Sequence, residues 1–468
     1  MKKYIIVFMC LSSLFFAPKA FGVESNEDLR AKVAAMEKML MELKGQLEKQ
    51  VETSKAEKEE IQAIREEVKG IMPGDEFYWA KKAKELSDKG LAPWFGKQDS
   101  KPFLRRMGRN TYVGGYMDHE LRFSENGDNT FDQHRLIPFI YSDVSDRVKF
   151  ATEIEIEHGG PDTSGGVSSE KGELKVEFAT IDFLMTDWLN YRAGIILSPL
   201  GKFNLVHDSP LQDLTDRPMV NRRIIPTTLS ESGMGFFGTL YPTEMSKIDY
   251  EIYAVNGFSV AEDGTVVDSG DSFIRSARGS QKSDNNTNPA IVGRVAYSPF
   301  LGLELGASFH TGNIDDHGSN KMTIKAFDWA YQRGPFELVG EYAHASIERD
   351  GLLVTGTERS AEYNGDMWGY YIEPRYHFMP QILKDLAPTV FRDDSTFTAV
   401  LRWGELNVNQ PLPSAGDRRK SRLTPGINWR YTEDTVFKAE YQVNWEAGRV
   451  TTHEVSNNNL VFSVATYF

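Results

Sequence analysis

The chain ends on the stretch Leu460-Val-Phe-Ser-Val-Ala-Thr-Tyr-Phe468, and this stretch decides how the rest of the sequence is interpreted. Even-numbered residues, from Leu460 to Phe468, form one face, and odd-numbered residues form the other. A period of two over about nine residues is typical of one tilted β-strand that crosses a bilayer. An ordinary half-buried strand that happens to come last has the same pattern. The other end of the chain helps to distinguish the two.

The N-terminus has the pattern of an export signal. A basic start is followed by an apolar segment at residues 4–16 and by small residues in Ala20-Phe21-Gly22, which suit a cleavage site. We therefore expect residues 1–22 to be a signal peptide. Cys10, the only cysteine, lies inside it, so the mature chain can form no disulfide and has no thiolate for catalysis or metal binding.

The remaining sequence lacks the pattern of membrane-spanning helices. Beyond the signal, no run of about eighteen apolar residues occurs. After residue 110 the segments are roughly 7–12 residues long, alternate in polarity and are rich in aromatic residues. An exported, cysteine-free chain of this kind fits a transmembrane β-barrel in the outer membrane of a Gram-negative bacterium. In such barrels a terminal aromatic residue, here Phe468, is an assembly signal.

Sixteen strands can be counted, and their spacing alternates. We expect the barrel domain at residues 109–468, with strands at 112–123, 135–141, 148–158, 174–178, 191–197, 234–241, 248–256, 291–297, 303–310, 322–331, 336–347, 367–378, 396–406, 422–431, 436–445 and 460–468. An even number lets the barrel close with both chain ends on the periplasmic side. Short links alternate with long ones, as periplasmic turns alternate with extracellular loops. The link at 379–395 is long for a periplasmic turn.

A coiled coil is predicted before the barrel, within residues 23–74. A heptad repeat runs without a break from Leu29 to Ile71, and three of its core positions are the polar residues Gln50, Ser54 and Glu57. A single amphipathic helix on another surface is the alternative. Porins with this layout are trimers, so we expect a homotrimer. Residues 75–108 would be an anchoring linker or a periplasmic plug.

The segment at residues 198–232 is the best candidate for a pore constriction. It follows the fifth strand, so it would be the third extracellular loop, which folds into the pore in general porins. Its charged candidates are Lys202, His207, Arg217, Arg222, Arg223, Asp208, Asp213 and Asp216. Opposed charges there would sort small polar solutes. The alternative is an external loop packed on its own barrel or on a neighbour.

This segment also carries a family resemblance. The motifs Gly201-Lys-Phe-Asn, His207-Asp-Ser-Pro-Leu, Asp216-Arg-Pro and Ile225-Pro-Thr-Thr-Leu-Ser-Glu-Ser-Gly233 resemble the corresponding region of the phosphate-selective porin O and P family. The resemblance covers roughly residues 110–468 and implies a sixteen-stranded porin. In the phosphate-selective members, arginine and lysine line the pore as a ladder.

The charges of this chain depart from that ladder. The net charge is −14. The inward candidates on the strands are mixed in sign: Lys175, Arg192, Arg294, Lys325, Arg402, Arg422 and Arg430 against Glu153, Glu155, Glu157, Glu251, Glu337, Glu341 and Glu440. The pattern therefore does not identify phosphate as the solute.

Catalytic and cofactor motifs are weak. Gly233-Met-Gly235-Phe-Phe-Gly238 matches a dinucleotide-binding pattern on paper, but no helix is expected after it. The nine histidines form no recognisable ligand motif, so we expect no enzyme, no metal and no cofactor.

Three functions stay open. The first is passive diffusion of small hydrophilic, charged solutes or anions through a water-filled pore. The second is a sheath around a multihaem cytochrome. The third is a structural tether whose coil reaches the cell wall. The expected partners are outer-membrane lipid and small ions, with no nucleic acid.

Overall fold

The computed structural model describes residues 105–106, 110–160, 172–260, 265–267, 273–318, 320–348, 353–355, 366–408, 419–446 and 457–468. The predicted signal peptide, the predicted coiled coil and most of the predicted linker lie outside these residues. Two compact units divide the chain, Met1–Tyr78 and Trp79–Phe468, and everything below concerns the second. Among the described residues, no helix is both long and apolar enough to cross a membrane.

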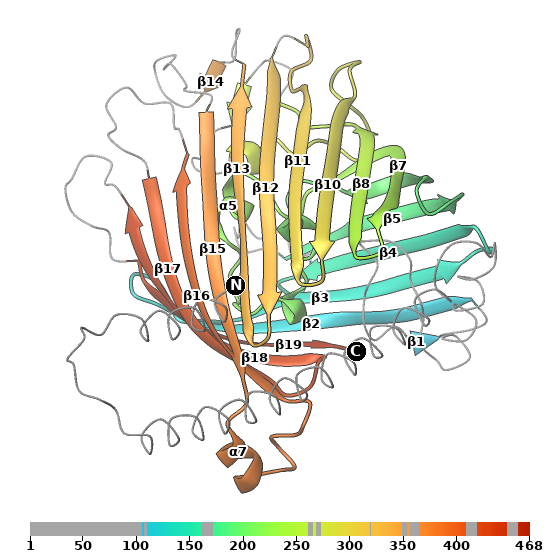
Figure 1. Ribbon diagram of the computed structural model, residues 1–468. Helices are drawn as coiled ribbons and strands as arrows, with labels where there is room; N and C mark the ends of the chain where they lie inside the picture. The colour runs from blue at the N-terminus through green and yellow to red at the C-terminus, as the bar shows by residue number, and fades with distance from the viewer. Residues whose placement is uncertain are drawn as a thin grey trace, which may run out of the picture. The chain divides into compact units, whose positions relative to one another are not determined.

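The second unit is a closed antiparallel barrel (Figure 1). Its sheet has 17 strands, of which the short β1 (Arg105–Arg106) only extends the edge of β2; the other sixteen close a ring. They are β2 (Thr111–Ser124), β3 (Thr130–Asp143), β4 (Val148–Glu157), β5 (Glu173–Leu184), β6 (Asn190–Leu197), β7 (Ser230–Thr243), β8 (Ser246–Val255) and β10 (Ala290–Phe300). The ring continues through β11 (Leu303–Asn313), β12 (Lys321–Arg333), β13 (Phe336–Ile347), β15 (Asp366–Phe378), β16 (Thr396–Asn407), β17 (Arg419–Arg430), β18 (Thr435–Glu446) and β19 (Asn459–Tyr467). Each of the sixteen predicted strands is confirmed. The glycine motif at 233–238 lies within β7, so no helix follows it.

The last strand closes the barrel against the first. Tyr467 is opposite Tyr116 in the register of β19 and β2. The terminal Phe468 extends the pairing, because its backbone N–H donates to Gly115 O at 2.9 Å and its carbonyl accepts from Gly115 N at 3.2 Å. A Cβ at position 115 would lie 2.6 Å from the Phe468 ring. Glycine at this position therefore makes room for the terminal aromatic residue.

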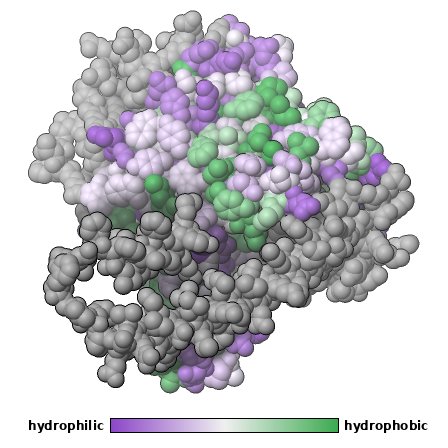
Figure 2. Space-filling model, in the orientation of Figure 1, coloured by the Kyte–Doolittle hydropathy of each residue, from purple (hydrophilic) through white to green (hydrophobic). Residues whose placement is uncertain are grey.

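The two faces of the wall differ in polarity. Outward side chains such as Ile252, Val295 and Phe327 are large, apolar and exposed, whereas their inward neighbours include buried Arg294 and Asp328. Figure 2 shows hydrophobic side chains gathered on the outward face, with hydrophilic residues toward the upper edge. An apolar exterior on a closed ring of strands satisfies the lipid environment and leaves no backbone group unpaired at an edge. This is the architecture of an outer-membrane barrel.

The connections follow the predicted alternation, with one addition. The turn between β15 and β16, which is long for a periplasmic turn, contains the helix α7 (Gln381–Leu386) (Figure 1). The predicted ends of the two strands at this turn, residues 378 and 396, are confirmed. The loops at the other end include the helix α6 (Phe273–Ser276) and two short strands, β9 (Thr265–Val267) and β14 (Leu353–Thr355), which pair in parallel.

Candidate functional site

The segment between β6 and β7 lies inside the barrel. It contains three short helices, α4 (Lys202–Leu205), η1 (Ser209–Leu211) and α5 (Met219–Arg223). Prolines start two of them, Pro210 in the first turn of η1 and Pro218 at the N-cap of α5, where their missing N–H costs no hydrogen bond. Figure 1 shows α5 on the inner side of the ring, where it contacts β15 and β16. We call residues 198–229 the inner segment.

Apolar packing fixes the inner segment to both sides of the interior. Leu200, Val220 and Ile224 belong to one buried cluster, which includes inward residues of β8, β10, β12 and β13. Leu205 belongs to a second cluster with Tyr116 and other inward residues of β2, β3 and β5. The interior is therefore not uniformly polar, and the segment spans it from one apolar cluster to the other.

The absence of a side chain at Gly426 of β17 makes room for one further side chain of the inner segment. Leu214 packs onto β17 at Gly426, where an added Cβ would lie 2.3 Å from Leu214 Cδ2. A larger residue at position 426 would therefore displace the segment from the wall.

Polar and charged contacts hold the middle of the inner segment to β2, β15, β17 and β18. Asp213 lies 3.0 Å from Arg430 and 3.1 Å from Arg375. Burial opposes ionisation of this carboxyl, but the two arginines dominate and hold the pKa of Asp213 below its ordinary value. Asp216 lies 2.7 Å from Arg122 and accepts a hydrogen bond from Gln442 at 2.6 Å.

The remaining acidic and weakly basic candidates are also paired. His207 Nε2 lies 2.7 Å from Glu177 Oε1, and Asp208 accepts a hydrogen bond from the Tyr467 hydroxyl at 2.8 Å. Lys202 lies 3.3 Å from Glu304 of β11. These contacts tie the segment to β5, β19 and β11.

The three arginines of the segment have different surroundings. Arg217 is half-buried and donates to Thr227 O at 2.5 Å and to Thr228 Oγ1 at 3.4 Å. Its burial and the nearby Arg135 lower the pKa of Arg217 to about 9, so it stays charged at neutral pH. Arg222 is exposed on α5, whereas Arg223 is half-buried and has a partner.

Two arginines that sequence reasoning missed join this group. Arg275 of α6 donates to Thr227 O at 2.8 Å, and Arg278 donates to Thr228 O at 3.0 Å. Partial burial, Arg278 and Arg222 lower the pKa of Arg275 to about 10. Both residues belong to a long extracellular link in the sequence, and no pattern there indicated that it would turn inward. We call Arg217, Arg222, Arg275 and Arg278 the arginine cluster.

Most candidate wall residues form cross-strand ion pairs. Lys175 lies 2.5 Å from Glu155, Arg192 lies 2.6 Å from Asp182, and Arg294 lies 2.5 Å from Asp328. Further pairs are Glu157 with Arg135, Arg402 with Glu373, and Arg430 with Asp213, while Glu153 accepts from the Tyr141 hydroxyl. These paired charges line the interior, and they also hold neighbouring strands and the inner segment together.

One inward placement is wrong. Lys325 is exposed beside outward Phe327, while Ile324 and Ala326 are buried. The alternation in β12 is apolar on both faces near this point, so polarity alone assigned Lys325 to the wrong side. Its aliphatic stem can lie along the apolar exterior while its ammonium reaches toward the polar edge.

Comparisons with known proteins support the fold and do not identify a solute. No family model matches the sequence, so the resemblance to the phosphate-selective porin O and P family stays a prediction. An uncharacterized protein of Aquifex aeolicus (strain VF5) is 31% identical over 304 residues. The match covers 61% of this chain and 66% of that protein, so the chain spans slightly less than two thirds of its relative.

Solved structures give the architecture. OmpF of Salmonella typhi, in complex with daunomycin, has a TM-score of 0.51 at 11% identity, and the match covers 78% of this chain and 100% of that one. An anion-selective porin from Comamonas acidovorans has a TM-score of 0.48 at 11% identity, over 76% of this chain and 99% of that one. With its apolar exterior and its ring of sixteen strands, the chain has the fold of an outer-membrane porin.

Proposed function

We propose that this protein is a porin that lets small hydrophilic solutes diffuse through the outer membrane and that it favours anions. The observation that carries the proposal is the arginine cluster, which lies where the inner segment meets α6. Porin-like diffusion is supported by the fold, and the sign of the selectivity is inferred from the charges alone.

The arginine cluster is positive and poorly compensated. Within the described part of the chain, no carboxylate lies within ion-pair distance of Arg217, Arg222, Arg275 or Arg278. Three of the four donate instead to the carbonyl or hydroxyl oxygens of Thr227 and Thr228. Burial and the repulsion of Arg278 and Arg222 lower the pKa of Arg275, and a passing anion would relieve that repulsion.

The acidic residues that interact with the cluster are already paired with other bases. Glu157, which acts on Arg217 and Arg275, pairs with Arg135, and Asp216, which acts on Arg222, pairs with Arg122. Asp213 and Asp216 contact arginines of the wall, and Glu231 lies 2.9 Å from His310. A carboxylate that is already paired attracts a mobile cation weakly, because most of its field is cancelled at short range. The net effect at the inner segment is therefore positive.

The inner segment weighs against the cytochrome sheath. It packs on β8 to β13 at one side and bonds to β17, β18 and β19 at the other, so it occupies space that an enclosed cytochrome would need. The tether depends on the predicted coil, which lies outside the described residues. The homotrimer is proposed from the layout that this chain shares with trimeric porins.

The test is the current through single molecules of the purified full-length protein in a planar bilayer. A porin gives discrete conductance steps, grouped in threes for a trimer, and an anion-favouring one gives a reversal potential of the anionic sign under a potassium chloride gradient. A cation-selective wild type would refute the selectivity. Absence of any conductance would refute the porin function itself.

A further inference from the structure

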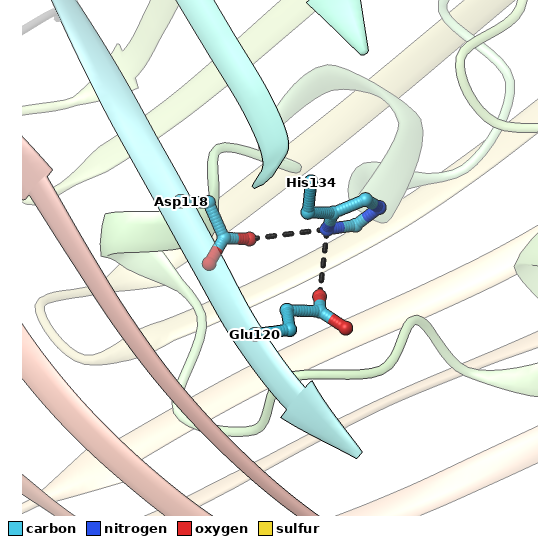
Figure 3. Close-up of side chains that lie close together, drawn as sticks. All are labelled: Asp118, Glu120 and His134. Carbon is cyan, nitrogen blue, oxygen red and sulfur yellow. Dashed lines mark hydrogen bonds and ion pairs between the residues drawn. The ribbon is translucent and has the colours of Figure 1, made fainter. Parts of the chain in front are cut away.

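A bulge between β2 and β3 gathers three side chains that can bind a metal ion. Asp118 is opposite Arg135 and Glu120 is opposite Asp132, so one residue of β2 faces two residues of β3, Gln133 and His134. A bulge of this kind re-aims side chains. Here it turns His134 toward the same face as the two carboxylates (Figure 3).

The distances among these side chains suit a small cation. Nδ1 of His134 lies 3.2 Å from Asp118 Oδ2 and 2.6 Å from Glu120 Oε1. The three potential ligand atoms all lie within 4.8 Å of one another. A tetrahedral zinc ion with bonds of about 2.1 Å separates neighbouring ligand atoms by about 3.4 Å, so only small side-chain shifts are needed.

Two buried carboxylates share one imidazole nitrogen at this site. Asp118 is 1% exposed and Glu120 is 4% exposed, and one oxygen of each carboxylate is directed at Nδ1 of His134. A single imidazole nitrogen carries at most one proton, so it can serve only one carboxylate at a time. A divalent cation between the three groups would satisfy both.

Neighbouring side chains would orient the ligands. Arg122 lies 3.3 Å from the other oxygen of Glu120, which leaves Oε1 directed at the site. Gln133 donates to the backbone carbonyl of Asp118 at 3.3 Å. Supporting contacts of this kind raise the affinity of metal sites, although the positive charge of Arg122 also limits it.

A second pair of side chains lies beside the site. His158 Nδ1 is 2.7 Å from Asp132, and the rings of His134 and His158 are 5.9 Å apart. His134 and His158 are both partly exposed, so an ion could reach Asp118 and Glu120 past these two histidines.

We propose that Asp118, Glu120 and His134 form a binding site for a divalent transition-metal ion of the Zn²⁺ type in the barrel wall. Imidazole with two carboxylates suits Zn²⁺, Mn²⁺, Fe²⁺ or Ni²⁺, whereas Ca²⁺ and Mg²⁺ prefer oxygen ligands alone. The site leaves at least one coordination position for water or solute. It does not depend on the anion preference proposed above.

The test is calorimetric titration of Zn²⁺ into the full-length protein in detergent after dialysis against EDTA. We expect one Zn²⁺ per chain in the wild type, and an affinity lower by about 100-fold or more in His134→Ala and in Glu120→Gln, because even supporting residues of metal sites contribute 10–100-fold. The matched control is His377→Ala. His377 is similarly exposed and lies 3.4 Å from a single carboxylate, Glu337.

The outcomes distinguish the site from unspecific binding. Equal loss in His377→Ala, unchanged binding in both site variants, or tighter binding of Ca²⁺ than of Zn²⁺ would overturn the proposal. Heat-modifiable migration on gels checks that each variant is folded. If His134→Ala does not fold, Glu120→Gln, which keeps the size of the side chain, decides the result.

Discussion

Replacing Arg222 by glutamine should reduce the anion preference of the pore more than any other single change in the inner segment. From the sequence alone, Arg217, Arg222 and Arg223 were equivalent candidates for the pore constriction. The structure shows that their surroundings differ. Arg217 is half-buried and bonds to Thr227 and Thr228, so its loss would disturb the segment as well as remove a charge. Arg222 is exposed on α5, so its replacement removes a charge with little effect on packing.

The size of the effect follows from Coulomb's law. A univalent ion that passes roughly 6–8 Å from the guanidinium, at an effective dielectric between 20 and that of water, interacts with it by about 0.5–3 kcal/mol. Salt with a screening length of about 10 Å reduces this toward 1 kcal/mol. A change of about 1 kcal/mol corresponds to roughly fivefold in the ratio of anion to cation permeability.

The assay is the reversal potential across a planar bilayer under a potassium chloride gradient. Arg222→Lys should behave like the wild type because it keeps the charge. The matched control is Arg392→Gln, which removes the same charge from an exposed arginine in the turn after α7, 3.0 Å from Asp394. Equal shifts in Arg222→Gln and Arg392→Gln would show that only net charge matters, and no shift in either would place the arginine cluster outside the ion path.

Three further predictions concern assembly and packing. Removing residues 23–74 should leave a foldable barrel but weaken the trimer, seen as a less heat-resistant oligomer on gels; an unchanged oligomer would assign the assembly to barrel contacts. Deleting Phe468 should reduce outer-membrane levels far more than stability in detergent, since burial of one aromatic side chain contributes only about 2 kcal/mol; equal losses would make its role structural. Gly426→Val should push Leu214 off the wall at a cost of about 1–3 kcal/mol and increase current noise, and an unaltered urea midpoint would contradict that contact.

The strands were predictable because their signal is local. A two-residue period is visible within each segment, and it remains visible whatever the strand pairs with. The inward placement of Glu153, Glu155 and Glu157 followed from the same period, and the structure buries the first two completely. Strand ends differ from the predicted ones by a few residues, because pairing continues beyond the alternating core.

The interior was less predictable because its contacts join distant segments. The bulge that turns His134 toward Asp118 depends on the pairing of two strands, and neither sequence shows it alone. Arg275 and Arg278 reach Thr227 and Thr228 because α6 packs on α5, a contact between two loops. The apolar clusters were missed for a third reason: we expected a polar interior, so apolar residues on both faces of a strand had no assigned role.

A net charge of −14 is compatible with a pore that favours anions, because charge acts over short distances in salt. The buried carboxylates Glu155, Asp182 and Asp328 lie within 2.6 Å of a lysine or arginine, so each is largely neutralised where it stands. Arg217, Arg275 and Arg278 have the opposite arrangement, because the threonine oxygens to which they donate are neutral. An ion in the interior therefore meets local fields whose sign is set by which charges are paired, and the excess of carboxylates over the whole chain has little influence on it.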